Sequence, residues 1–265
     1  MPAVISKDGT KIAYDKVGRG PAVIVVEGAL VTGEASKPLA KLLAADFTVY
    51  SYDRRGRGDS TDTKPYSAEK EVEDIEALID VAGGTAYLYG ISSGAALALE
   101  AAMSLGNKVK KLAVYEAPYD SSEAGIRVWR EFKSKLAELL AADDRNGALL
   151  LQLKIAGAPD EAIEGMRREP EWKSMEAIAH TLAYDAAVVG EDRVVPSERA
   201  AGVTAQVLVM DGGASKEVIP FMHVTVEQLT KAIPGAQHRT LEGQGHDVDD
   251  KVLAPVLREF FGKEN

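Results

Sequence analysis

The stretch Tyr87-Leu88-Tyr89-Gly90-Ile91-Ser92-Ser93-Gly94-Ala95-Ala96 joins a short apolar run to an Ala/Leu-rich run through the pattern Gly-x-Ser-x-Gly. A strand, a tight turn and a helix in this order hold a serine on strained backbone, with its hydroxyl lifted clear of a sheet. Glycines at positions 90 and 94 let neighbouring backbone pass close to the turn. The helix that follows points its free N–H groups at any oxyanion formed there. The stretch predicts a nucleophilic Ser92, and the alternative is a turn that only connects two elements.

Apolar runs on either side of this stretch indicate a mostly parallel sheet. Residues 22–26 are apolar on both faces, which is typical of a strand inside a parallel sheet. Other runs with strand character cover residues 47–51, 86–89, 112–115, 207–210 and 238–241, with helical patterns between them. At the start of the chain, alternation on both sides of Asp8-Gly9 predicts a β-hairpin. A hairpin followed by strand–helix units predicts an α/β fold with helices on both faces of the sheet.

One part of the chain lacks strand character. Helical patterns fill residues 119–189, with Trp129 and Phe132 on the apolar face of the first helix. We interpret this part as a helical cap inserted into a core formed by residues 1–118 and 190–265. Connections of this kind leave a parallel sheet at the strand ends where ligands bind, which favours a lid over the catalytic turn. Extra packing at a sheet edge is the alternative.

Composition excludes several classes of function. The net charge of −10, the pI near 5.0 and the lack of a basic stripe argue against nucleic-acid binding. The absence of cysteine excludes disulfides and thiolate metal sites. Residues 1–8 lack the pattern of a signal peptide, and no apolar run approaches the length of a membrane span. We therefore expect a cytoplasmic protein with a small-molecule substrate and no membrane partner, and the sequence leaves its oligomeric state open.

Activation of a serine hydroxyl requires a base, and that base requires an orienting acid. Of the four histidines, His246 lies in a glycine-flanked loop after the last expected strand, which suits a general base. His238, in an expected strand, is interpreted as structural, and His223 as a surface or capping residue. His180 belongs to the cap, where it either packs or meets substrate. No group of His, Asp and Glu has the spacing of metal ligands, so we expect no metal and no cofactor.

Together, three segments resemble the α/β-hydrolase superfamily: the Gly90–Gly94 motif, residues 53–60, and the Gly243-Gln244-Gly245-His246 loop. The likeness extends over nearly the whole chain, and the cap falls where that family inserts one. It implies an eight-stranded, mostly parallel sheet and a catalytic triad of serine, acid and histidine. In relatives, residues 53–60 would form a structural turn with internal salt bridges. Their glycine spacing does not match a phosphate-binding loop.

The triad acid departs from the common pattern of the superfamily. Family members usually carry a Gly-x-x-Asp turn after the penultimate strand, whereas this chain has serine at that place in Gly212-Gly213-Ala214-Ser215. A bacterial branch similar to the zearalenone-type lactone hydrolases places the acid after the strand that follows the nucleophile helix. The matching residue here is Glu116, a carboxylate that needs a partner at the end of a core strand. Asp211 remains the alternative acid.

An oxyanion hole requires two backbone donors. We expect them to be the N–H groups of Ser93 and Ala29. Glu27 stands where many relatives have histidine, and a carboxylate aimed at the oxyanion would oppose catalysis. Candidate substrate-binding residues come from the loop after residues 22–26 and from the cap, and they are Leu30, Trp129, Trp172, His180 and Tyr184.

The expected activity is hydrolysis of a carboxylic ester or lactone through an acyl-enzyme, carried by Ser92, His246 and Glu116. Two alternatives use the same pocket. One is carbon–carbon bond hydrolysis or acyl transfer with the same triad. The other is a ligand-binding receptor with little turnover. A haloalkane or epoxide reaction is disfavoured because its nucleophile would be a carboxylate.

Overall fold

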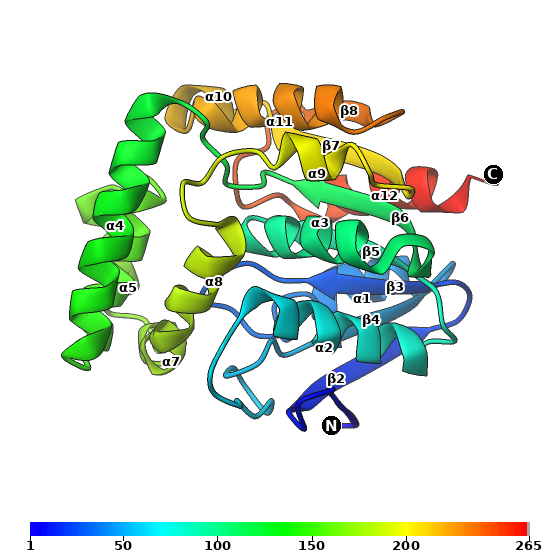
Figure 1. Ribbon diagram of the computed structural model, residues 1–265, viewed down its shortest axis with the longest axis horizontal. Helices are drawn as coiled ribbons and strands as arrows, with labels where there is room; N and C mark the ends of the chain where they lie inside the picture. The colour runs from blue at the N-terminus through cyan, green and yellow to red at the C-terminus, as the bar shows by residue number, and fades with distance from the viewer. Residues whose placement is uncertain (264–265) are drawn as a thin grey trace.

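The computed structural model describes residues 1–263, and its centre is an eight-stranded sheet (Figure 1). The strand order is β1-β2-β4-β3-β5-β6-β7-β8. β1 and β2 run antiparallel to their neighbours, and every other pairing is parallel. The strands are β1 (Ala3–Ile5), β2 (Lys11–Gly18), β3 (Ala22–Val26), β4 (Thr48–Tyr52), β5 (Ala86–Ile91), β6 (Val109–Tyr115), β7 (Gln206–Gly212) and β8 (Gln237–Leu241). The predicted hairpin and the mostly parallel sheet are confirmed.

Helices cover both faces of this sheet. On one face, Ile24 and Val26 of β3 share a core with α2 (Ala68–Val81), α3 (Ser93–Leu105) and α11 (Phe221–Ala232). On the other, Val23 and Val25 pack with α1 (Lys37–Leu43) and α12 (Asp250–Gly262). Because both faces are buried, β3 is apolar throughout, as expected of an interior parallel strand.

Five helices and a 3₁₀ turn follow one another between β6 and the next core elements. They are α4 (Glu123–Ala141), α5 (Arg145–Ile155), α6 (Asp160–Met166), α7 (Glu171–Ile178), the 3₁₀ turn Ala179–Thr181 and α8 (Leu182–Val189). In Figure 1, α4, α5 and α7 lie together at the left, beside the sheet, and α8 lies between them and the sheet. This helical run falls within the interval that the sequence analysis assigns to a cap. Two short helices, α9 (Ser197–Ala200) and α10 (Ser215–Val218), flank β7 in the chain.

Two further points concern the helices. α11 begins at Phe221, so His223 lies in its first turn. No helix of residues 1–263 combines the length and apolar character that crossing a bilayer requires.

Candidate active site

Ser92 occupies the turn between β5 and α3, and its backbone is strained. Its φ of 56° and ψ of −129° lie in a region that residues with a side chain rarely adopt. The two flanking glycines are required by close backbone approach. A Cβ at Gly94 would lie 2.1 Å from the carbonyl oxygen of Val26, and one at Gly90 would lie 2.4 Å from that of Gly94. The turn has the geometry of a nucleophile elbow.

Glu116 directly follows β6, and its fully buried carboxylate is held from two sides. The N–H of Gly212 donates to Oε1 at 2.9 Å, and Nδ1 of His246 lies 2.6 Å from Oε2. Glu116 also has a positive φ of 48°. Strained residues with a side chain persist where the surrounding structure fixes them, often at functional sites. Because Nδ1 faces the carboxylate, Nε2 is the ring nitrogen that remains for a hydroxyl or a substrate.

The loop that carries His246 is anchored through the carbonyl oxygens of Gly245 and Gln244, the two residues that precede the histidine. The hydroxyl of Tyr115, the last residue of β6, donates to the carbonyl oxygen of Gly245. The N–H of Ala214 donates to the carbonyl oxygen of Gln244 at 2.9 Å. These bonds join the histidine loop to the ends of β6 and β7, where Glu116 lies. The imidazole is thus positioned by elements far from it in sequence.

Ser92 and His246 line one cavity of about 60 Å³. Ala29 and Ser93 line it as well, beside Pro118 and Asp185. The apolar wall comes from the helical run and from α11, and consists of Trp129, Phe132, Ile155, Ala156, Ala186, Val189, Phe221 and Met222. Ser92 and His246 both line this cavity, and within residues 1–263 no direct hydrogen bond joins them. In enzymes without substrate, such bonds are often long and tighten in the reacting complex.

Of the five residues suggested for substrate binding, Trp129 alone lines this cavity within the described chain. Leu30, Trp172, His180 and Tyr184 do not line it, and for them a contact with substrate stays a prediction. Tyr184 stacks on Tyr66, with ring centroids 3.8 Å apart, and donates to Asp62 at 2.6 Å. His180 packs edge-on against Tyr184. Trp172 lies under Arg167, and Leu30 is buried in the core.

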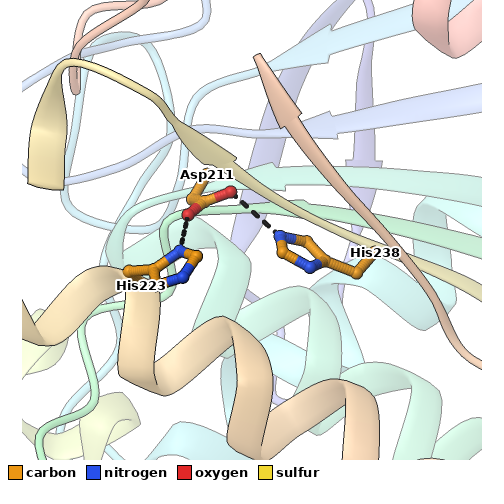
Figure 2. Close-up of side chains that lie close together, drawn as sticks. All are labelled: Asp211, His223 and His238. Carbon is orange, nitrogen blue, oxygen red and sulfur yellow. Dashed lines mark hydrogen bonds and ion pairs between the residues drawn. The ribbon is translucent and has the colours of Figure 1, made fainter. Parts of the chain in front are cut away.

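Asp211 does not approach His246 but binds two other histidines (Figure 2). Its Oδ2 lies 2.6 Å from Nδ1 of His223, and its Oδ1 lies 3.1 Å from Nε2 of His238. Thr240 donates to the same Oδ1 at 2.7 Å. This corrects the interpretation of His223 as a surface or capping residue. The spacing of these three residues along the sequence does not indicate a metal site, but the fold brings them together as a group that could hold an ion.

Glu27 does not line the cavity that Ser92 and His246 share. Instead it lines a separate groove with Tyr89 and Asp250. Burial raises the pKa of Glu27 to about 7, and the negative charge of Asp250 adds to this effect. Glu27 thus lines a different groove from Ser92, and its raised pKa favours the neutral carboxyl, which weakens the conflict raised by its position in the sequence.

Residues 53–60 form a turn whose arginines reach outward rather than pairing within it. Arg54 binds Glu71 of α2 at 2.7 Å and Asp185 of α8 at 2.6 Å. Arg57 binds the other oxygen of Asp185 at 2.7 Å. The expected salt bridges exist, but they run to α2 and α8 and are not internal to the turn. No local pattern indicates such pairings, because their partners lie far apart in sequence.

Asp185 connects this arginine pair to the nucleophile turn. Its Oδ1 accepts a hydrogen bond of 2.7 Å from the hydroxyl of Ser93, the residue after Ser92. Burial opposes the charge of Asp185, but Arg57 and Arg54 outweigh it and hold the pKa of this carboxyl below its usual value. Arg57 also donates to the carbonyl oxygen of Gly28 at 2.5 Å. The network thus contacts Ser93 and also Gly28, which precedes Ala29, and the N–H groups of Ala29 and Ser93 are the predicted oxyanion donors.

Comparison with known proteins agrees with this architecture. A model of the alpha/beta hydrolase family matches residues 28–255. An α/β hydrolase from Sphaerobacter thermophilus DSM 20745 is 45% identical, with a TM-score of 0.90, over 98% of this chain and 100% of that one. A hydrolase from Pseudomonas aeruginosa PA01 shares the fold at 20% identity and a TM-score of 0.76, over 99% of this chain and 98% of that one.

A curated relative matches over a shorter stretch. The uncharacterized hydrolase YraK of Bacillus subtilis (strain 168) is 32% identical over 96 residues, which is 35% of this chain and 35% of that protein. The family match, in contrast, includes the nucleophile turn, the residue after β6 and the histidine loop. The chain belongs to the α/β-hydrolase family.

Proposed function

We propose that this protein is a serine hydrolase that cleaves a carboxylic ester or lactone through an acyl-enzyme. The observation that supports this most strongly is the 2.6 Å pair between the buried Glu116 and His246, because His246 lines the same cavity as Ser92. A buried carboxylate that holds Nδ1 of an imidazole is the arrangement that prepares Nε2 to accept a proton. The residues 119–189 would serve as a cap over this cavity.

In the proposed reaction, Oγ of Ser92 attacks the acyl carbon while Nε2 of His246 takes the hydroxyl proton. Glu116 stabilises the resulting imidazolium, and the N–H groups of Ala29 and Ser93 hold the oxyanion. Neither N–H donates a hydrogen bond within residues 1–263, so both remain available. His246 then protonates the leaving alkoxide. Water attacks the acyl-enzyme while Nε2 of His246 takes a proton from it, and His246 returns this proton to Oγ of Ser92 as the acid product leaves.

Asp185 contributes as a positioning residue in this scheme. It binds the hydroxyl of Ser93 and, through Arg57, the carbonyl of Gly28. Both residues are adjacent to or part of the proposed oxyanion hole. Fixing these segments holds the donors in place before the charge develops, which is where such sites gain most of their effect.

The position of the acid after β6 favours the lactonase-like branch, and one structure with the same fold is an enol-lactonase from Burkholderia xenovorans LB400, at 19% identity and a TM-score of 0.68. Carbon–carbon bond hydrolysis remains a second candidate, since a meta-cleavage product hydrolase also shares the fold at 18% identity. Both reactions would use the same three side chains. The expected cytoplasmic location stays a prediction.

Replacement of the nucleophile tests the proposal. We expect Ser92→Ala to lower kcat on an activated ester by about 10⁴-fold or more, because no other group would form the acyl-enzyme. A panel of p-nitrophenyl esters and simple lactones supplies the assay, and Ser121→Ala, at a partly exposed serine outside the cavity, supplies the control. Hydrolysis by Ser92→Ala at a near-wild-type rate would refute the proposal.

A further inference from the structure

Arg193 is a buried cation on the wall of the same cavity as Ser92 and His246. It lies in the segment between α8 and α9, is 6% exposed, and has a positive φ of 58°. Its guanidinium carbon is 4.3 Å from the ring centroid of Phe221 and 5.3 Å from that of Trp129. Both aromatic residues also line the cavity, so the guanidinium lies beside its aromatic wall.

Arg193 differs from the other deeply buried arginines in having no carboxylate partner. Arg54, Arg55 and Arg57 each form an ion pair of 2.9 Å or less with an aspartate or glutamate. Arg193 donates from Nε to the carbonyl oxygen of Pro118, but no ion pair involves it within residues 1–263. Burying a charge without a counter-ion is unfavourable unless a ligand supplies one.

The charge on Arg193 persists at neutral pH in spite of this burial. Burial lowers the pKa of Arg193 to about 10, although the negative charge of Asp120, which forms no ion pair with it, acts in the opposite direction. Since Nε is already used, the two terminal nitrogens remain for a planar anion. A guanidinium binds a carboxylate through two parallel hydrogen bonds, and the aromatic faces beside it favour the same orientation.

We infer that Arg193 forms an anion subsite, so that the substrate carries a carboxylate a few bonds away from the scissile acyl carbon. This inference rests on the proposed hydrolase function. Because Arg193 and Ser92 line one cavity, a single small molecule that contacts both would carry the carboxylate and the acyl carbon on one chain. The substrate class is therefore a half-ester or lactone of a short dicarboxylic acid.

The test compares hydrolysis of monoethyl succinate with that of ethyl butyrate, an ester of similar length that lacks the carboxylate, by pH-stat titration. We expect wild type to favour the anionic ester. Arg193→Met should lower the ratio of the two kcat/KM values by about 30-fold, the worth of a charged hydrogen-bonded pair. Arg193→Lys keeps the positive charge but loses the two parallel donors of the guanidinium, so its ratio should lie between those of wild type and Arg193→Met. Arg130→Met, at an exposed arginine paired with Asp192, is the control.

Several outcomes separate this inference from the proposed function. An unchanged ratio in Arg193→Met, or equal use of the two esters by wild type, would overturn the subsite while leaving the hydrolase intact. Failure to hydrolyse either ester would count against the hydrolase. Succinate binding by calorimetry then still reports on Arg193. Should Arg193→Met not fold, stronger inhibition of wild type by succinate than by butyrate supports the subsite, and equal inhibition contradicts it.

The cluster of Asp211, His223 and His238 carries a second, independent inference (Figure 2). One ligand atom from each residue lies within 4.8 Å of the others. Asp211 is 1% exposed, whereas the two histidine side chains are 25% and 29% exposed, so an ion can enter from solvent. Two imidazoles and one carboxylate are a common ligand set for Zn²⁺, with water in the fourth position.

The surroundings of the cluster already have the features of an outer ligand shell. Thr240 donates to Asp211 at 2.7 Å and orients its carboxylate. On the far side of His223, Nε2 lies 3.4 Å from the carboxylate of Glu227. A metal-ligating histidine usually gives its second N–H to a carboxylate in this way. The geometry points to a Zn²⁺-class site that ties β7, the edge strand β8 and the start of α11 together.

Calorimetric titration of chelator-treated protein with ZnCl₂ tests this site. We expect one saturable site and a rise in Tm of about 3 °C, because the ion binds only the folded state. Co²⁺ should show the visible absorption of tetrahedral coordination. His238→Asn should abolish both signals, and His180→Asn, at a histidine outside the cluster, should keep them. Absence of saturable binding, or binding that survives His238→Asn, would overturn the site.

Discussion

Two carboxylates stand at the ends of the neighbouring strands β6 and β7, and each holds histidine, yet their surroundings differ. Glu116 is fully buried, binds one imidazole, and that imidazole faces a cavity that contains Ser92. Asp211 is equally buried but binds two half-buried imidazoles away from that cavity. Under the proposed function, the same pairing of acid and base serves catalysis at Glu116 and not at Asp211. The proposal attributes this difference to Ser92, which lines a cavity with the imidazole of His246.

The sharpest way to break this comparison is to neutralise one carboxylate at a time. Glu116→Gln keeps the shape but loses the charge that stabilises the imidazolium. We expect kcat on an activated ester to fall by about 10³- to 10⁴-fold. Steady-state kinetics at neutral pH measures this. If Asp211→Asn is the crippling change while Glu116→Gln hydrolyses normally, the acid is assigned to the wrong strand.

Replacing Asp185 tests whether the network beside Ser93 affects catalysis as well as stability. Asp185→Asn leaves Arg54 and Arg57 with less charge compensation in a buried place, where loss of one partner costs about 3–5 kcal/mol. It also weakens the hydrogen bond that holds Ser93. We expect a lower free energy of unfolding in urea together with a lower kcat. A variant that loses stability but retains full kcat in its folded fraction would show that the network only supports the fold.

Asp211→Asn tests the second carboxylate of the comparison, the one that binds His223 and His238. Hydrogen bonds from His223, His238 and Thr240 overcome burial and hold the pKa of Asp211 below its usual value. A lowered carboxyl pKa stabilises the fold above the unfolded pKa and loses that effect as the pH falls through the folded one. In metal-free buffer at pH 7 we expect a loss of about 2 kcal/mol from the free energy of unfolding, with kcat on a neutral ester changed by less than about 3-fold. Equal stability of variant and wild type would contradict this structural role.

Glu27→Gln has the smallest expected effect, and its sign is set by pH. The folded pKa of about 7 exceeds the ordinary value of 4.5, so the folded state prefers the protonated carboxyl. That preference stabilises the fold fully below pH 4.5 and disappears as the pH rises through 7. The variant should therefore gain about 1–2 kcal/mol over wild type between pH 5 and pH 8. Thermal melts across this range provide the measurement, and parallel curves would contradict it.

The residues that local sequence reveals are those whose own backbone carries the signal. Gly90 and Gly94 flank Ser92 because a Cβ at either would collide with neighbouring backbone, and this is visible as a motif. Glu116 follows an apolar strand, and His246 lies in a glycine-rich loop, so both stand out in their segments. The mostly parallel sheet likewise follows from alternating strand and helix patterns, whereas the order of its strands does not.

What local sequence does not reveal depends on contacts between distant segments. Asp185 meets Arg54 and Ser93 across more than one element, and Asp211 meets His223 and His238 only after β7, β8 and α11 pack together. Within the described residues Arg193 differs from the other buried arginines in having no carboxylate partner, and no sequence pattern can show this. Aromatic residues of the segment 119–189 are ambiguous in sequence for the same reason, since only their neighbours in the fold distinguish Trp129, which lines the cavity, from Tyr184, which stacks on Tyr66.

The most direct test of the central claim is the rate and position of labelling by a fluorophosphonate probe. We predict a single adduct on the peptide that contains Ser92, formed much more slowly in Glu116→Gln and at the wild-type rate in Asp211→Asn. Labelling of another residue, or equal rates in wild type and Glu116→Gln, would contradict the account.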